Sequence, residues 1–225
     1  MYKILNMKIH NGIAIIERDT HISKWVIEHN RLDFDQNQLP TYFPYFKPNG
    51  YFVNIGANIG CYALPFIKQA KEAHLFEPNK EAFECLEYNM DNYDNVNLYN
   101  FGISDKESSC KVLSDNDNVG MVYLKEDEDG QCITRSIDSF NFKGCDFILM
   151  DCEGFELKAL IGAKETITKY KPIMVIEIND ATLNRQGITR NDIFAWLREN
   201  NYIYRNIYKN QGLEDSQLDI ICEPI

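Results

Sequence analysis

Tyr51-Phe52-Val53-Asn54-Ile55-Gly56-Ala57-Asn58-Ile59-Gly60 combines an apolar run with a turn that contains two glycines. The apolar run, residues 51–55, is typical of a buried strand. Glycines directly after a strand let the backbone bend sharply and let a ligand approach it closely. Residues 61–70 are mostly helix-forming, so we expect the turn to direct a helix N-terminus toward that ligand.

An acid follows the next apolar stretch. Residues 74–76 end in Glu77, seventeen positions after Gly60. In a nucleotide-binding βαβ unit, an acid at the tip of the second strand hydrogen-bonds the ribose hydroxyls. Taken alone, the turn could be a strand-to-helix corner, and Glu77 could be a surface acid before Pro78 and a helix cap at Asn79. Together, the turn and the acid predict a site for an adenosine-type ligand.

The glycine spacing narrows the choice of ligand. Gly56-x-x-x-Gly60 lacks the middle glycine of the Gly-x-Gly-x-x-Gly dinucleotide fingerprint, which lets the backbone approach a pyrophosphate. The pattern therefore favours a ligand without phosphates, such as S-adenosylmethionine, over NAD. A nicotinamide-dependent dehydrogenase is the less favoured alternative.

The composition limits the class of protein. The 225 residues are 44% apolar and 25% charged, which is ordinary for a soluble globular domain. A net charge of −11 argues against a general nucleic-acid or anionic-membrane binder. The first residues contain no signal-peptide core, and no stretch approaches membrane-spanning length. The seven cysteines are scattered and form no Cys-x-x-Cys pair, so we expect reduced thiols and a cytoplasmic location.

Strand and helix patterns alternate along most of the chain. The expected strands are residues 12–16, 51–55, 74–76, 96–101, 145–150, 172–178, 202–207 and 218–222, and the expected helices are residues 21–29, 39–46, 61–70, 79–91, 155–170 and 193–200. This order predicts an α/β, Rossmann-like fold: a mostly parallel sheet with helices on both faces. We expect the last two strands to form an antiparallel hairpin.

Two segments depart from the alternation. Within residues 107–136, residues 109–113 and 119–124 are expected to be short strands joined by polar turns, which predicts an antiparallel β insertion. Residues 1–47 form a front segment, and the polar patch 33–38 within it is either a solvated loop or part of a lid. We therefore divide the chain into this segment and one compact ligand-binding domain, residues 48–225.

The carboxyl ends of the strands carry the candidate chemistry, because ligands of open α/β sheets lie at this edge. Asp151 and Glu153 follow the strand at 145–150. A carboxylate at a strand tip can orient a hydroxyl and accept its proton while the oxygen takes a methyl group in line. Asp151 could instead cap a helix, and Glu153 could interact with the helix dipole.

Glu177 lies inside an apolar strand, and a buried acid needs a partner or a ligand. Asp151, Glu177 and Asn179 could together form an oxygen-rich site of the magnesium type. Their spacing matches no specific metal motif, so we predict no metal.

Five blocks resemble one known family: Val53–Gly60, Phe76–Pro78, Arg135–Phe140, Asp151–Glu156 and Ile176–Ile178. This succession resembles the FkbM-type family of S-adenosylmethionine-dependent methyltransferases over about residues 48–205. The resemblance implies a class I methyltransferase fold with a reversed final strand. It also implies O-methylation of a hydroxyl on a sugar, a glycan or a small metabolite.

Carried over to this chain, the resemblance implies a donor loop at Gly56, Asn58 and Gly60, a ribose contact at Glu77, and an adenine contact at Gly102 and Ile103. The predicted donor-binding residues are Asn54, Gly56, Ala57, Asn58, Gly60, Glu77, Pro78, Gly102, Ile103 and Asp151, and the predicted catalytic residues are Asp151 and Glu153.

The chain differs from the family at Asn54, where the family usually has Asp. Asn keeps the hydrogen bonds of Asp but loses the charge that faces the cationic donor. A non-catalytic adenosyl-ligand binding module is therefore the second hypothesis. Residues 1–47 resemble the family weakly, and we expect this segment to select the acceptor.

Overall fold

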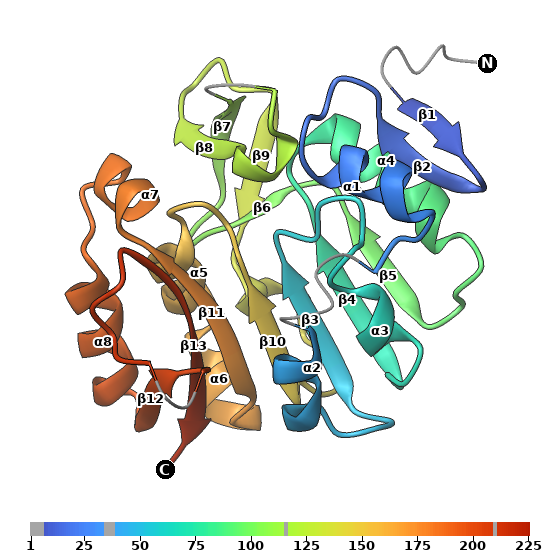
Figure 1. Cartoon of the computed structure of the whole chain (residues 1–225). Coiled ribbons are helices and arrows are strands. Elements are labelled where there is room, and N and C mark those ends of the chain that lie inside the picture. Colours follow the sequence, from blue (N-terminus) through green and yellow to red (C-terminus); the bar gives the residue numbers. More distant parts are fainter. Residues whose placement is uncertain (1–6, 34–38, 115–116, 209–210) are drawn as a thin grey trace.

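The computed structural model describes residues 7–33, 39–114, 117–208 and 211–225. Its centre is a seven-stranded sheet with the order β12-β13-β11-β10-β3-β4-β5 (Figure 1). The strands are β3 (Tyr51–Ile55), β4 (Glu72–Phe76), β5 (Val96–Tyr99), β10 (Phe147–Met150), β11 (Ile173–Asn179), β12 (Tyr202–Asn206) and β13 (Gln217–Pro224). Strand β13 runs antiparallel to both of its neighbours, whereas the other pairs of neighbours are parallel. The predicted parallel sheet and antiparallel terminal hairpin are confirmed.

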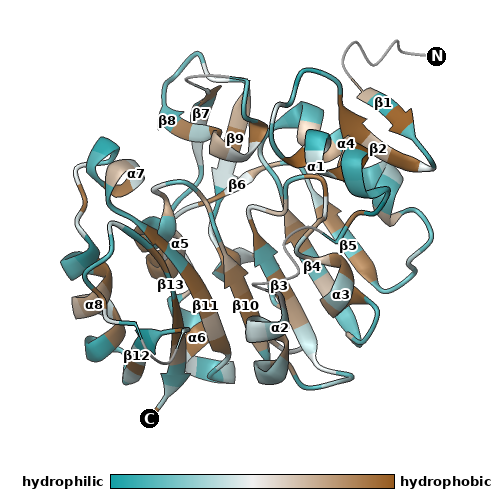
Figure 2. Ribbon diagram, in the orientation of Figure 1, coloured by the Kyte–Doolittle hydropathy of each residue, from teal (hydrophilic) through white to brown (hydrophobic). Residues whose placement is uncertain are grey.

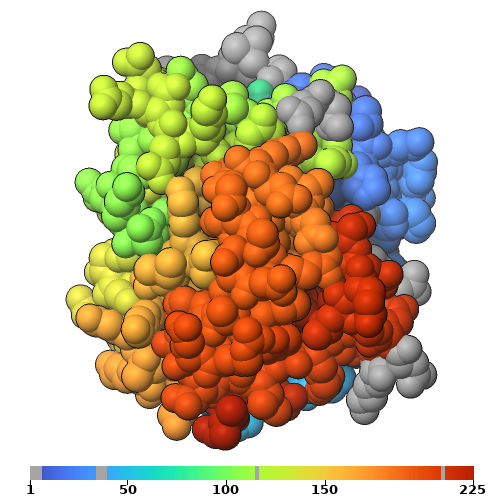
Figure 3. All heavy atoms as spheres, turned by 90° about the vertical axis from the view of Figure 1, so that its left-hand side faces the viewer, coloured from blue at the N-terminus to red at the C-terminus, as the bar shows by residue number. Residues whose placement is uncertain are grey.

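Helices cover both faces of this sheet, as predicted. Helices α3 (Leu64–Ile67) and α4 (Lys80–Met90) pack against one face, and α1 (Ile22–His29) contributes side chains to the same buried cluster. Helices α5 (Glu156–Gly162), α6 (Lys164–Tyr170) and α8 (Arg190–Glu199) pack against the other. Because both faces are covered, the central strands are mostly apolar, and β10 and β11 are largely brown in Figure 2. From the side, the C-terminal third of the chain covers much of the visible surface (Figure 3).

Stacked aromatic rings fill the first of these two layers. The ring of Phe66 on α3 stacks on Phe52 at 4.8 Å and on Phe147 at 5.3 Å between ring centroids. All three side chains are fully buried. Burial of large aromatic side chains provides much of the stability of such a layer.

The front segment belongs to the same core. Strands β1 (Met7–His10) and β2 (Ile13–Ile16) form an antiparallel hairpin, and α2 (Leu39–Tyr42) continues into the 3-10 turn η1 (Phe43–Tyr45). Ile15, Val26 and Phe46 are buried in one cluster with Phe52 of the central sheet. Residues 34–38 of the predicted polar patch lie outside the described residues.

The predicted insertion forms a separate four-stranded sheet with the order β6-β9-β7-β8. Its strands are β6 (Gly102–Ile103), β7 (Ser108–Leu113), β8 (Tyr123–Glu126) and β9 (Cys132–Arg135). Strand β7 pairs antiparallel with β8 and β9, as expected, whereas β6 pairs parallel with β9. The predicted strand at 119–124 is wrong at its start, because residues 119–121 form the 3-10 turn η2 (Val119–Met121).

Two predicted helices differ from those observed. The helix expected at 61–70 is reduced to α3, where Pro65 lies in the first turn and has no backbone N–H to donate to residue 61. The helix expected at 155–170 divides at Ala163 into α5 and α6. The carboxylate of Asp138, from the 3-10 turn η3 (Ile137–Phe140), accepts hydrogen bonds from the backbone amides of Glu165 and Thr166 and so caps α6.

A short helix, α7 (Asp180–Arg185), was not predicted. The side chain of Asn179 caps it by accepting a 3.1 Å hydrogen bond from the amide of Ala181. Across the residues that the structure describes, no helix has both the length and the apolar character needed to span a membrane.

Candidate functional site

The turn after β3 lies against the end of β10, where the chain order across the sheet reverses. Gly56 has a φ of +85°, and a Cβ atom there would lie 1.7 Å from the carbonyl oxygen of Asp151. Only glycine fits this contact. The amides of Gly56 and Ala57 both donate 3.0 Å hydrogen bonds to the carbonyl of Phe76, so the turn is also held to the end of β4.

Glu77 lies directly beside this turn. Its Oε2 accepts a 2.7 Å hydrogen bond from the amide of Asn58, and its Oε1 accepts one of 2.7 Å from the amide of Asn79. The side chain is buried, and burial raises the pKa of Glu77 to about 7 although both backbone donors lower it. Each carboxylate oxygen has two lone pairs, so each keeps one acceptor position for a ligand hydroxyl.

A cavity opens between the turn and Glu77. It is lined by Ile22, Ile55, Gly56, Ala57, Asn58, Tyr62, Phe76, Glu77, Pro78, Phe101, Gly102, Ile103, Val119, Gly120, Val122, Leu124, Asp151, Cys152, Glu153 and Phe155. We call it the first cavity. It includes every predicted site residue except Asn54 and Gly60. Its apolar wall from the insertion, Val122 and Leu124, was not predicted, because the contact between the insertion and the sheet edge is not visible in the sequence.

Gly60 lies away from this cavity and serves the packing of α4. A Cβ atom at Gly60 would lie 2.3 Å from Cε of Met90 and 3.0 Å from Cδ1 of Leu86. The glycine therefore lets the turn approach the helix closely. The part predicted for Gly60 in the donor loop stays a prediction.

The loop after β10 is held in an unusual conformation. Glu153 has a φ of 52° and Gly154 a φ of 106°, and a non-glycine residue in the left-handed region is strained. The buried carboxylate of Glu156 fixes this loop, because it accepts hydrogen bonds from the amides of Cys152 and Gly154. Glu156 was missing from the predicted site residues. Its position at the start of a helix, two residues after a glycine, was the available signal.

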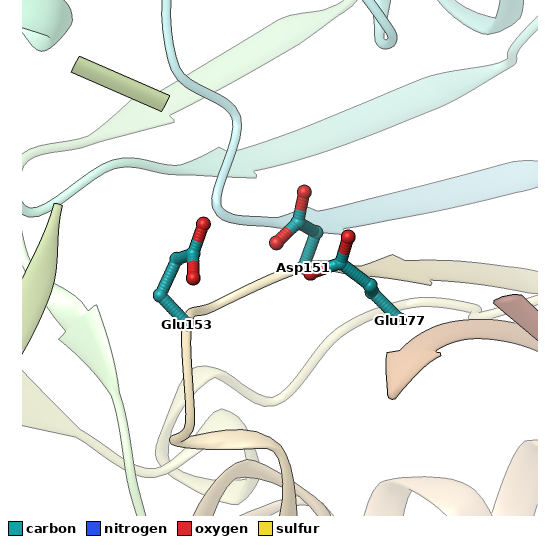
Figure 4. Close-up of side chains that lie close together, drawn as sticks. All are labelled: Asp151, Glu153 and Glu177. Carbon is teal, nitrogen blue, oxygen red and sulfur yellow. The ribbon is translucent and has the colours of Figure 1, made fainter. Parts of the chain in front are cut away.

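Three carboxylates meet beside this loop. One oxygen from each of Asp151, Glu153 and Glu177 can be chosen so that all three lie within 4.8 Å of one another. Figure 4 shows the carboxylate of Asp151 between the other two. Burial, followed by the charges of Glu177 and Glu153, raises the pKa of Asp151 well above its usual range. Burial, followed by Glu177, raises the pKa of Glu153 to about 8, although Arg185 lowers it.

A second cavity of about 490 Å³ adjoins the first. It is lined by His21, Ile22, Tyr42, Asn54, Gly56, Tyr62, Asn118, Gly120, Met121, Leu149, Met150, Asp151, Glu153, Val175, Glu177, Asn179, Gln217 and Asp219. The two cavities share Gly56, Tyr62, Asp151 and Glu153, among others. Its volume lies in the range of about 300–1,000 Å³ that is typical of small-molecule sites. The hydroxyl of Tyr42 donates a 2.6 Å hydrogen bond to Asp219 on its wall.

Asn54 lines the second cavity and not the first. Its side chain is 2% exposed, and its Nδ2 donates a 3.2 Å hydrogen bond to the carbonyl of Leu149. Its Oδ1 has no hydrogen-bond partner among the described residues. The donor contact predicted for Asn54 stays a prediction.

The three acids that the structure brings together differ from the oxygen-rich set of Asp151, Glu177 and Asn179 that the sequence suggested. Asn179 also lines the second cavity, and its Oδ1 accepts the hydrogen bond that caps α7. Glu153 takes its place beside Asp151 and Glu177. The left-handed backbone at Glu153 brings this side chain to the other two.

Comparison with known proteins gives a family match. The model of the methyltransferase FkbM domain matches residues 54–204. Among curated proteins, the 2-O-methyltransferase NoeI of Sinorhizobium fredii (strain NBRC 101917 / NGR234) is 27% identical, over 56% of this chain and 62% of its own length. The chain thus spans less than two thirds of this relative.

Solved structures share the fold at low sequence identity. Methyltransferase FkbM from Methylobacillus flagellatus KT has a TM-score of 0.54 and 18% identity, covering 79% of this chain and 44% of that one. SMU.1697c from Streptococcus mutans, solved in complex with SAH, has a TM-score of 0.54 and 9% identity, covering 84% and 96%. Precorrin-6y C5,15-methyltransferase from Geobacter metallireducens GS-15 has a TM-score of 0.51 and 13% identity, covering 86% and 92%. The predicted Rossmann-like class I methyltransferase fold is confirmed.

Proposed function

Because this chain belongs to the FkbM methyltransferase family, we propose that it transfers a methyl group from S-adenosylmethionine to a hydroxyl of a sugar, a glycan or another small metabolite. One observation carries the proposal. The first cavity, with its glycine turn and buried acid, joins the second cavity at Asp151 and Glu153. A donor in one cavity and an acceptor in the other would therefore meet at two carboxylates.

The first cavity suits the adenosyl part of the donor. Glu77 offers the open acceptor positions that ribose hydroxyls need, and it lies beside the turn that the nucleoside must approach. Phe101, Ile103 and Leu124 give the cavity an apolar wall suited to an adenine ring. When bound, the donor supplies an electrophilic methyl group on a sulfonium.

The second cavity suits a polar acceptor. Its walls carry several hydrogen-bonding side chains, among them Tyr42, Asn179 and Gln217. In the proposed reaction the acceptor oxygen forms a bond to the methyl carbon while the sulfur–carbon bond breaks. Asp151 holds the acceptor hydroxyl by accepting its hydrogen bond and takes its proton. Alignment of the oxygen with the sulfonium supplies much of the rate in such a displacement.

The name of NoeI supports a hydroxyl acceptor, since that protein is a 2-O-methyltransferase. The net charge of −11 would repel a polyanion, so it suits a small neutral acceptor better. We therefore propose a sugar or glycan hydroxyl first, and a small metabolite next.

Two measurements test the proposal. Calorimetry should detect binding of S-adenosylmethionine and of its demethylated product, S-adenosylhomocysteine. Incubation with methyl-labelled donor and a panel of sugars, glycans and hydroxylated metabolites should transfer label, and Asp151→Ala should abolish the transfer. If neither S-adenosylmethionine nor S-adenosylhomocysteine binds, the proposal is wrong. Tight donor binding without transfer to any acceptor would favour the binding module.

A further inference from the structure

We propose that Asp151, Glu153 and Glu177 bind a hard divalent cation of the Mg²⁺ type where the two cavities meet, with Asn54 Oδ1 as a neutral fourth ligand. Binding of the cation does not depend on the proposed function. Its role, which is to hold and polarise the acceptor hydroxyl, rests on that function.

The strand register places two of these acids, Asp151 and Glu177, side by side. Asn54, Leu149 and Val175 lie at the same level on the neighbouring strands β3, β10 and β11. Side chains two positions further along a strand point to the same face, and neighbouring strands are about 4.8 Å apart. Asp151 and Glu177 follow Leu149 and Val175 by two positions, so they project side by side over one face. On β3 the matching position is Gly56, which has no side chain and leaves the space open.

Like charges on adjacent strands destabilise a sheet, and the described residues compensate these charges only in part. Glu177 Oε1 accepts a 2.9 Å hydrogen bond from Nε2 of Gln217. Buried oxygens of Asp151 (Oδ1) and Glu153 (Oε2) have no hydrogen-bond partner among the described residues. Buried carboxylates are normally paired with a donor, a positive side chain or a metal ion.

A separate observation on Asn54 points to the same ligand. Its side chain is 98% buried, lines the second cavity with the three acids, and leaves its Oδ1 without a partner among the described residues. Amide oxygens are common neutral ligands of Ca²⁺, and Mg²⁺ also takes oxygen ligands. An Asp at position 54 would add a fourth negative charge to this group, whereas Asn adds an oxygen without charge.

The distances suit a hard cation. The three carboxylate oxygens lie within 4.8 Å of one another. Oxygens on opposite sides of one ion lie about 4.2 Å apart for Mg²⁺ and about 4.9 Å apart for Ca²⁺. Three acids and one amide would leave about two positions of an octahedral ion for water or acceptor hydroxyls. An ion-bound hydroxyl loses its proton more readily, which would help the proposed transfer.

The test uses the full chain after removal of metal ions with EDTA. Calorimetry with MgCl₂, CaCl₂ and MnCl₂, and electron paramagnetic resonance with Mn²⁺, should each show one binding site. Asp151→Asn and Glu177→Gln should weaken binding at least about tenfold. Glu199→Gln removes the same charge from the exposed surface of α8 and should change the affinity less than twofold.

Thermal unfolding gives an independent readout. Saturating MgCl₂ should raise the melting temperature of the wild type and of Glu199→Gln, but not that of Glu177→Gln. Without metal, Glu177→Gln should melt above the wild type, because it relieves the repulsion; this also shows that the variant folds. No binding of any of the three ions at 10 mM, or equal binding by wild type and Glu177→Gln, overturns the proposal.

S-adenosylhomocysteine binding, measured on the same samples, separates the two proposals. Glu177 does not line the first cavity, so Glu177→Gln should bind this compound with wild-type affinity. Compound binding without ion binding overturns the cation site and leaves the proposed function standing. Ion binding without S-adenosylhomocysteine binding overturns the proposed function and leaves the cation site standing.

Discussion

The backbone amide of Asn58 donates a 2.7 Å hydrogen bond to the carboxylate of Glu77, which ties the turn after β3 to the tip of β4. The two features that suggested a nucleoside site therefore form one structural unit. The acid both shapes the turn and faces the first cavity.

Replacement of Glu77 should weaken donor binding. We expect Glu77→Ala to lower the affinity for S-adenosylhomocysteine by about 10–100-fold, because hydrogen bonds to a charged group contribute about 1.5–3 kcal/mol. Calorimetry measures this change. Glu81→Gln, which removes a charge from the adjacent helix and its exposed pair with Arg18, should leave the affinity within about twofold. Equal effects of the two substitutions would contradict the ribose contact.

Glu77 should also make stability depend on pH. Its pKa is about 7 in the folded protein against 4.5 for the free side chain, so the folded state binds more protons between these values. The free energy of unfolding contributed by Glu77 is thus fully present below pH 4.5 and is lost as pH rises through 7, by up to about 3 kcal/mol. Urea unfolding at pH 5.5 and 8.5 should show a larger fall for wild type than for Glu77→Gln. A steeper fall in the variant would refute this assignment.

Gly56 should tolerate no side chain. In Gly56→Ala the new Cβ would meet the Asp151 carbonyl at 1.7 Å, so we expect a loss of at least about 3 kcal/mol in the free energy of unfolding. Gly187→Ala is the matched control, since Gly187 has a φ of +70° but no atom within 4 Å of an added Cβ. It should lose only about 1 kcal/mol. Similar losses in denaturant unfolding would show that backbone conformation, and not the close contact, explains Gly56.

Glu156 should act as a positioning residue for Asp151 and Glu153. In Glu156→Ala the backbone amides of Cys152 and Gly154 both lose the carboxylate that accepts their hydrogen bonds, at a cost of about 1–3 kcal/mol for each unpaired donor. We expect lower affinity for S-adenosylhomocysteine together with reduced stability, measured by calorimetry and urea unfolding. Glu165→Gln, on the exposed surface of α6, should change neither quantity.

The aromatic layer should dominate the stability of its face of the sheet. Phe66→Ala should lower the free energy of unfolding by about 3–5 kcal/mol, because it leaves a cavity between Phe52 and Phe147. Ile203, which is 57% exposed on β12, provides the comparison: Ile203→Ala should cost less than about 1 kcal/mol. Chemical denaturation of both variants tests the difference, and comparable losses would argue against a tightly packed layer.

The central sheet could be predicted from the sequence because its strands are covered on both faces. Largely apolar runs such as residues 51–55 and 173–178 are typical of strands that are covered on both faces. The break between α5 and α6 could not be predicted, because its cause lies far away in the chain. The carboxylate that caps α6 belongs to Asp138, which is separated from this helix by strand β10 and helix α5.

The candidate site was predictable where it follows strand ends, and less so elsewhere. Gly56, Glu77 and Asp151 follow three neighbouring strands and therefore lie together. The proximity of Glu153 to Glu177 depends on a left-handed residue that no pattern in the sequence announces. Gly60 shows the opposite case, since a glycine that matched a ligand motif packs against Met90.

Strand β13 lies between β11 and β12, although it follows both in the chain. On the ribosome, β12 therefore emerges before the strand that joins it to the rest of the sheet. Until residue 224 has left the exit tunnel, the edge of β11 stays unpaired and can attract other strands. At this stage the unpaired edge of β11 would be a binding site for chaperones that cover open strand edges.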